Sequence, residues 1–188
     1  VTLDTPVRGY RLSVAVARGL ALWMSFEDTI RVADLKTRGE RVGRIRDDVQ
    51  AGAAELVRVT EFMKPRIEEI CGTLPSRVGR FVMQSPRLSR TLGRLTKDRQ
   101  ISTSTVSGFL FLRAIAGLAR WRRGTLRFSE EQMRIDAWLA DVAAAHAHDY
   151  DLAVEIAECQ RLVKGYGDTH ARGLHNLARV IAAAKAGA

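Results

Sequence analysis

The sequence predicts an all-α fold, a helical bundle of about seven to nine helices with no sheet. Only four of the 188 residues are proline, whereas alanine, arginine and leucine are abundant, and this composition favours helices over strands. Apolar residues recur at helical spacing, and no segment of any length alternates between apolar and polar residues. We expect residues 1–188 to form a single helical domain. Because residue 1 is valine and not methionine, we also expect this domain to be an excised or processed piece of a longer protein.

The first two predicted helices span residues 10–24 and about 28–50. The first is apolar almost all round, with Arg11 and Arg18 together on one side, so we expect it to be mostly buried. Ser25 is followed three residues later by a carboxylate, which is typical of a capping box. This pattern predicts where the second helix begins.

Four charged residues of alternating sign mark one face of the second helix: Glu27, Arg31, Asp34 and Arg38. Their spacing lets neighbouring pairs contact each other, which stabilises an exposed helix by ~0.2–0.5 kcal/mol per pair. If this charged stripe is exposed, it is an ordinary solvated face. If it is buried, it forms a polar network or a binding site.

Shorter helices are predicted in the middle of the chain. Pro65 is expected to break or kink a helix near Lys64, because its ring clashes with the preceding turn. The most apolar stretch, residues 105–119, is shorter than the ~20 residues that span a bilayer, so we predict a buried helix and no membrane contact. The elements predicted here are helices at 53–73, 76–84 and 87–97, a polar loop at 98–108 and a helix at 105–122.

Three helices are predicted in the last third of the chain: 129–146, 150–164 and 169–184. Ser129 begins a second capping-box pattern, and Asp168 is the predicted N-cap of the last helix. Lys164 followed by Gly165 is a common helix end. Helical spacing places four residues of the first of these helices inward or near the inward face: Met133, Ala137, Trp138 and Val142.

Positive charge is concentrated in one quarter of the chain. Residues 77–127 carry 12 basic side chains and one acidic side chain, whereas the whole chain has a net charge of +9. Such a block indicates nucleic acid, an acidic protein or an anionic cofactor as a partner, or else a basic surface without a dedicated ligand. Nucleic acid is the less favoured partner, because no zinc-finger spacing or aromatic-rich RNA motif occurs, although residues 76–97 are compatible with a helix-turn-helix. Six arginines form the candidate docking surface for an acidic partner, here called the arginine surface: Arg87, Arg90, Arg94, Arg120, Arg122 and Arg123.

Neither a metal site nor a catalytic site is predicted on this chain. The two cysteines, Cys71 and Cys159, are 88 positions apart without a CxxC motif, which argues against a cysteine-based zinc or iron–sulfur site held by this chain alone. His146 and His148 are two residues apart, whereas a zinc site on a helix needs an i, i+4 pair. No GxSxG motif, P-loop or complete dinucleotide fingerprint occurs. Free thiols and the lack of a signal-peptide pattern predict a cytoplasmic protein.

Residues 159–173, CQRLVKGYGDTHARG, are dense in glycine and charged residues. A helix end and a helix cap explain the glycines and the aspartate, but they leave Lys164, Tyr166, His170 and Arg172 without a local role. We expect these four side chains to make polar contacts elsewhere in the protein, first with the charged stripe at 27–34. The candidate polar network or ligand site therefore comprises Glu27, Asp28, Arg31, Asp34, Lys36, Lys164, Tyr166, Asp168, His170 and Arg172.

Two stretches resemble a known family: RLSVAVARGLALWMSFEDTIRVADLKTR (11–38) and, more specifically, AECQRLVKGYGDTHARGL (157–174). They are similar to the C-terminal region of bacterial indolepyruvate ferredoxin oxidoreductase beta-type subunits. The resemblance implies that the parent protein is a 2-oxoacid:ferredoxin oxidoreductase, and that this chain is a C-terminal fragment of one of its subunits. Such enzymes oxidatively decarboxylate arylpyruvates to aryl-acetyl-CoA, use thiamine diphosphate and iron–sulfur clusters, and pass electrons to ferredoxin.

The resemblance carries no active-site residue onto this chain. The thiamine-diphosphate signature of the family is GDG followed by an asparagine-containing segment, whereas this sequence has Gly167-Asp168-Thr169, and closely spaced cysteines are absent. The resemblance therefore implies an accessory, non-catalytic domain, with both cofactors elsewhere in the parent enzyme. The implied partners are the rest of the parent subunit, its partner subunit and ferredoxin, a small acidic protein that the basic segment could steer. The alternative is a nucleic-acid-binding helical module that uses residues 77–127.

Overall fold

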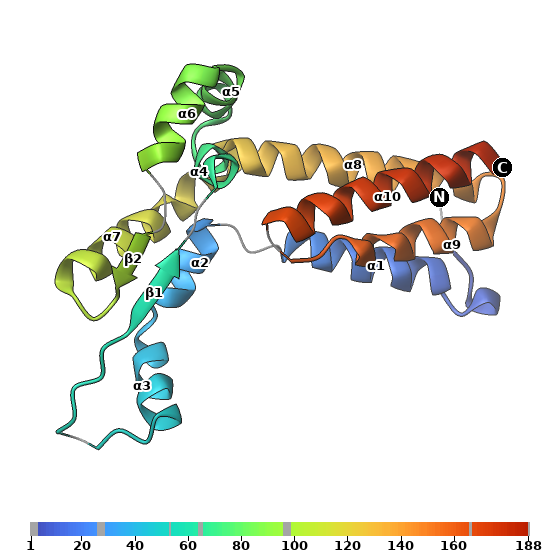
Figure 1. Cartoon of the computed structure of the whole chain (residues 1–188). Coiled ribbons are helices and arrows are strands. Elements are labelled where there is room, and N and C mark those ends of the chain that lie inside the picture. The colour runs from blue at the N-terminus through green and yellow to red at the C-terminus, as the bar shows by residue number, and fades with distance from the viewer. Residues whose placement is uncertain are drawn as a thin grey trace. The chain divides into compact units, whose positions relative to one another are not determined.

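The computed structural model describes residues 4–25, 29–52, 54–63, 66–95, 99–165 and 167–187. It is 79% helical, so the predicted all-α class is confirmed. The described residues form ten α-helices, three short 3-10 helices and one two-stranded sheet (Figure 1). The chain divides into two compact units, the terminal unit (Val1–Phe26 with Glu131–Ala188) and the central unit (Glu27–Glu130). The expectation of a single domain stays a prediction.

The terminal unit is a bundle of long helices. Its elements are η1 (Pro6–Arg8), α1 (Arg11–Met24), α8 (Leu126–His146) from Glu131 onward, α9 (Tyr150–Glu158), η3 (Cys159–Leu162) and α10 (Gly167–Gly187). α1 packs against α9 and α10 packs against η3, and the four long helices lie side by side (Figure 1). Ile135, Trp138, Val142 and Ala145 recur three or four residues apart on α8, and all four are buried in the shared core.

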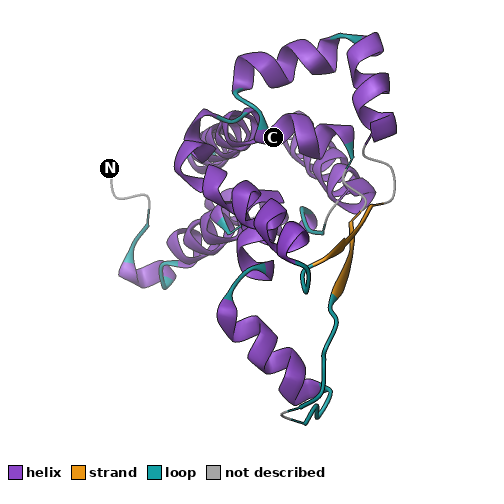
Figure 2. Cartoon of the chain, turned by 90° about the vertical axis from the view of Figure 1, so that its left-hand side faces the viewer, coloured by secondary structure: helices purple, strands orange, loops and turns teal. Residues whose placement is uncertain are grey.

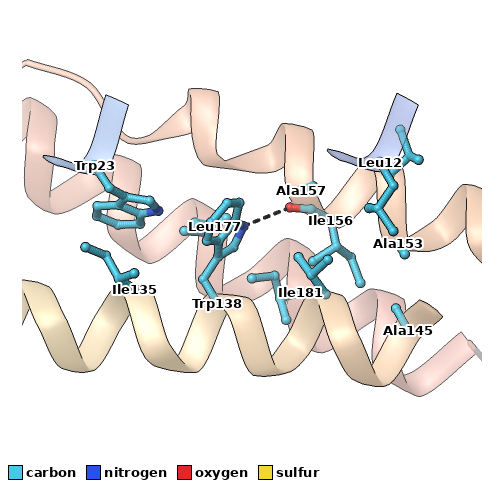
Figure 3. Packing of buried hydrophobic residues seen from close by; sticks show 12 residues of the cluster. Leu12, Trp23, Ile135, Trp138, Ala145, Ala153, Ile156, Ala157, Leu177 and Ile181 are labelled. Atoms are coloured by element: carbon cyan, nitrogen blue, oxygen red, sulfur yellow. Dashed lines mark hydrogen bonds between the residues drawn. The ribbon is translucent and has the colours of Figure 1, made fainter. Parts of the chain in front are cut away.

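Trp138 lies at the centre of this core. It is 2% exposed, and its indole Nε1 donates a hydrogen bond to the main-chain oxygen of Ile156 over 3.2 Å (Figure 3). The ring also lies against Gly19 of α1, where an added Cβ would come within 2.8 Å of it. Glycine at position 19 therefore lets α1 approach the Trp138 ring closely.

The central unit combines short helices with the small sheet. Its elements are α2 (Thr29–Lys36), α3 (Gly39–Asp48), β1 (Thr60–Met63), α4 (Ile67–Thr73), α5 (Ser76–Gln84), α6 (Pro86–Leu95), β2 (Arg99–Ser102), α7 (Val106–Gly117) and η2 (Leu118–Gly124). The two strands pair antiparallel, with Thr60 opposite Ser102 (Figure 2). α2 packs against α7, where Ala33, Leu112 and Ala116 form a buried cluster.

The predicted single helix over 28–50 is wrong, because two helices, α2 and α3, occupy this range. The hydroxyl of Thr37 donates to the main-chain oxygen of Ala33 over 3.0 Å, which satisfies a carbonyl at the end of α2. Arg38 then adopts an extended conformation, and α3 begins at Gly39. The hydroxyl bond and the extended residue together separate the two helices.

The prediction of no sheet is wrong for two short segments. Residues 54–59, predicted to be helical, form no helix, and β1 follows them. β2 lies within the predicted polar loop at 98–108. Strands of four residues are too short to show an alternating pattern, and each is held by its pairing with the other strand. The predicted break near Lys64 lies outside the described residues.

Both predictions of mostly buried helices are wrong. α1 buries only Leu12, Gly19 and Trp23, and α7 buries only Leu112 and Ala116. The rest of each helix is partly buried or exposed despite its apolar sequence, because each helix packs through one face. Apolar side chains of α1 and α7 are therefore left on the surface of their own units.

Helix boundaries in the last third differ from the predictions by a few residues. α8 begins at Leu126, and the hydroxyl of Thr125 accepts from the main-chain nitrogen of Phe128, so Thr125 and not Ser129 caps this helix. Met133 and Ala137 are exposed, contrary to the prediction, whereas Val142 and Trp138 are buried. α9 ends at Glu158 and η3 continues to Leu162, before Gly165. α10 begins at Gly167, so Asp168 lies in its first turn and not at the N-cap.

Candidate functional site

The residues of the predicted polar network belong to two units. Arg31, Asp34 and Lys36 lie in the central unit, and Lys164, Asp168, His170 and Arg172 lie in the terminal unit. Glu27, Asp28 and Tyr166 lie outside the described residues. The expected contact between the two groups stays a prediction.

Asp34 forms ion pairs within its own stripe. Its Oδ2 accepts from Arg38 over 2.8 Å and from Arg31 over 3.2 Å. The hydrogen bond from Arg38 holds the pKa of Asp34 below its ordinary value, and the charges of Arg38, Arg31 and Arg113 add to this effect. The three paired side chains are about a third to a half exposed, so this part of the stripe is a solvated helix face.

Lys36 pairs with a carboxylate that the sequence patterns did not indicate. Glu61 of β1 contacts Lys36 through Oε2 and Arg41 through Oε1, the latter over 2.5 Å. The residue is only 8% exposed. Burial by itself raises the pKa of Glu61, but the interactions with Lys36 and Arg41 outweigh it and hold the pKa below its ordinary value. Glu61 therefore stays charged at neutral pH and links β1 to both α2 and α3.

His170 lies in a second buried polar cluster, in the terminal unit. It is 6% exposed, and its Nε2 lies 4.0 Å from Oε1 of Glu131 on α8. The same oxygen accepts a hydrogen bond from Arg134 over 3.1 Å. Of the four side chains without a local role, His170 has a charged partner distant in sequence, whereas Lys164 and Arg172 are exposed.

Three members of the arginine surface share one face of α6. Arg87, Arg90 and Arg94 are three and four residues apart and exposed, so they lie close together on the helix surface. Leu88 and Leu92 occupy the opposite side, which gives α6 a strongly amphipathic pattern. The other three arginines lie on η2, where Arg120 and Arg123 are exposed and Arg122 is half-buried.

Large apolar side chains are also exposed on the central unit. Trp121 is 66% exposed between the arginines of η2. Exposed apolar residues also lie on α5, α6 and α7: Val78, Phe81, Met83, Leu88, Phe109, Leu110 and Phe111. Aromatic residues and arginine are the types most enriched at protein interfaces.

Comparison with models of protein families assigns the chain to a family. A model described as "Family of unknown function (DUF6537)" matches residues 2–183. The chain belongs to the DUF6537 family. No curated protein and no solved structure matches it. The matched range of this DUF6537 chain includes both units, the arginine surface and residues 159–173.

The cysteines of the DUF6537 chain do not fit an iron–sulfur cluster. Cys71 and Cys159 are both free and lie in different units, whereas such clusters are held by sets of closely placed cysteines. Burial raises the pKa of both thiols, so neither is a reactive thiolate at neutral pH. Over the described ranges, no three His, Cys, Asp or Glu side chains gather in a way that could hold a metal ion.

Two other findings concern thiamine diphosphate and membranes. Gly167-Asp168-Thr169 forms the first turn of α10 and lacks the third residue of a GDG motif, so these residues do not match the thiamine-diphosphate motif. Among the helices that the structure describes, none is both long enough and apolar enough to cross a bilayer.

Proposed function

We propose that this chain is an accessory, non-catalytic helical domain of an indolepyruvate (2-oxoacid) ferredoxin oxidoreductase. It serves assembly of the enzyme and docks acidic ferredoxin, while thiamine diphosphate and the iron–sulfur clusters are held elsewhere in the parent enzyme. The resemblance of residues 11–38 and 157–174 to that family supports the proposal. The two free, buried or half-buried thiols support a cytoplasmic location.

The single observation that carries the proposal is the mixture of arginine and exposed apolar side chains on the central unit. Arg87, Arg90 and Arg94 provide a cationic helix face without an acidic residue anywhere in α6. Exposed aromatic side chains such as Phe81 and Trp121 provide contact area for a protein partner. Cationic faces raise association rates with acidic partners, and apolar contacts slow dissociation.

The docking role predicts a change in salt dependence. Replacing Arg87, Arg90 and Arg94 by glutamine in the intact enzyme is expected to lower the rate of ferredoxin reduction about tenfold at low ionic strength. The difference is expected to vanish at high ionic strength, where salt already screens the charges. The measurement is the second-order rate of ferredoxin reduction across a series of salt concentrations.

A matched variant controls for net charge. Arg44, Arg58 and Arg179 are exposed arginines outside the arginine surface, and replacing all three by glutamine removes the same amount of charge. We expect this control to keep a salt dependence close to that of the unmodified enzyme. Equal salt slopes for the unmodified enzyme and the α6 variant would rule out docking at α6.

Nucleic-acid binding is a second candidate function, favoured by the clustering of three arginines on one face of α6. It predicts that the chain retards random duplex DNA or RNA in a gel at about 50 mM salt. The retardation should fall steeply as salt is added, because about three phosphate contacts release counterions on binding. The α6 triple variant should lose this shift, and the Arg44, Arg58 and Arg179 control should retain it. No retardation at low salt would eliminate this candidate.

A further inference from the structure

A groove on the terminal unit has the size of a small-molecule site. It encloses about 320 Å³ between α1 and the segment where α9 continues into η3. This volume lies at the lower end of the ~300–1,000 Å³ that ligand pockets occupy. Val14, Leu22 and Ala157 contribute apolar side chains to its lining.

Gln160 in the lining has an unsatisfied side chain. The residue is 3% exposed, and its Oε1 has no hydrogen-bond partner in the structure. A buried acceptor in this state destabilises a fold unless another group donates to it. A donor group on a bound molecule would satisfy this requirement.

The rim of the same groove is cationic. Arg18 is exposed and forms no ion pair in the described part of the chain. Arg161 has only a distant partner, with 3.8 Å between its Nη1 and Oε2 of Glu158, and Arg11 pairs with Asp151 over 3.2 Å. Among the described residues, the lining of the groove thus contains three arginines and a single acidic residue, Glu158. Arginine recognises carboxylate and phosphate groups through paired hydrogen bonds.

We propose that this groove binds a small organic anion. Its carboxylate or phosphate group would be held by Arg18 and Arg161, and its apolar body would contact Val14 and Leu22. A hydroxyl or amino group would donate to Oε1 of Gln160 once the amide, whose Oε1 is closed to solvent in the structure, turns toward the groove. The proposal explains why α1 keeps apolar residues on its outer face beside two arginines. It concerns the terminal unit alone and does not depend on the proposed docking function of the central unit.

Simple aromatic probes separate the three recognition elements. 4-Hydroxybenzoate carries an anion, an apolar ring and a donor, benzoate lacks the donor, phenol lacks the anion, and phenyl phosphate replaces carboxylate by phosphate. Calorimetric titration of the full chain is expected to rank 4-hydroxybenzoate above benzoate and phenol. The relative affinity of phenyl phosphate and benzoate decides which anionic group the site prefers.

Two variants test the assigned residues. R18Q is expected to weaken binding of 4-hydroxybenzoate about tenfold, whereas the control R179Q, an exposed arginine of α10 outside the groove, is expected to leave it unchanged. Q160M is expected to weaken 4-hydroxybenzoate about tenfold and benzoate little, while raising the melting temperature because an unpaired buried acceptor is removed. R18Q lies on the surface and keeps the test valid even if Q160M does not fold.

Three results would overturn the proposal. The first is that no probe binds the unmodified chain with a dissociation constant below about 1 mM. The second is that R18Q and R179Q have equal affinity for 4-hydroxybenzoate. The third is that Q160M weakens benzoate and 4-hydroxybenzoate equally, which would mean that Gln160 shapes the groove without contacting the donor.

Discussion

Replacing Trp138 by alanine is expected to lower the free energy of unfolding by about 3–5 kcal/mol. The indole is 2% exposed and is enclosed by α1, α9 and its own helix, so its removal leaves a cavity that the neighbouring helices can fill only partly. The main-chain oxygen of Ile156 also loses its indole donor. Urea denaturation, followed by far-UV circular dichroism, measures the difference in the free energy of unfolding.

A second tryptophan supplies the control. Trp121 is 66% exposed on η2, and replacing it by alanine makes the same chemical change at the surface. We expect this variant to lie within about 0.5 kcal/mol of the unmodified chain. If the Trp138 and Trp121 variants lost equal stability, Trp138 would not be the centre of the core.

Replacing Glu61 by glutamine is expected to lower the free energy of unfolding by about 1.5–3 kcal/mol at neutral pH. The substitution keeps the size of the side chain but removes the negative charge between Lys36 and Arg41. Both cations are only about a quarter exposed, so water replaces the lost partner incompletely. The same change at Glu155, an exposed residue of α9, is the control and is expected to have little effect.

The effect of the Glu61 variant should depend on pH in a defined direction. The pKa of Glu61 is lowered in the folded chain, so its ionised form contributes stability above the pKa of an unfolded glutamate, about 4.3. This contribution is lost as the pH falls through the lowered folded value. The stability difference between the unmodified chain and E61Q should therefore shrink below about pH 4. A difference that stays constant down to acidic denaturation would contradict the assigned role.

Local sequence patterns predicted helix positions well where residues at the start of the helix itself mark its beginning. α5 and α6 follow Pro75 and Ser85 as predicted, and α9 lies inside its predicted range. The starts of α3 and α8 were missed because they depend on Thr37 and Thr125, whose hydroxyl groups could equally have faced solvent. The strands were missed for a different reason, since β1 and β2 exist only as a pair separated by more than 30 residues.

The candidate site was predictable only in part. The arginines of α6 could be identified from composition, and their common face follows from helical spacing. Glu61 could not be identified, because its importance depends on the strand that places it between Lys36 and Arg41. Gln160 carries no sequence signal either, since an unpaired buried amide becomes visible only when all neighbouring groups are placed.

The division of the terminal unit between the two ends of the chain has a consequence during protein synthesis. The main-chain nitrogen of Leu12 donates to the hydroxyl of Tyr150, a contact that spans 138 residues of sequence. A ribosome adding about 5–20 residues per second takes on the order of ten seconds to cover that interval. Until α8, α9 and α10 have been made, the core-facing side of α1, with Leu12 and Trp23, lacks these partner helices. During that interval the nascent chain is therefore exposed to aggregation, and to chaperone binding, along the core-facing side of α1.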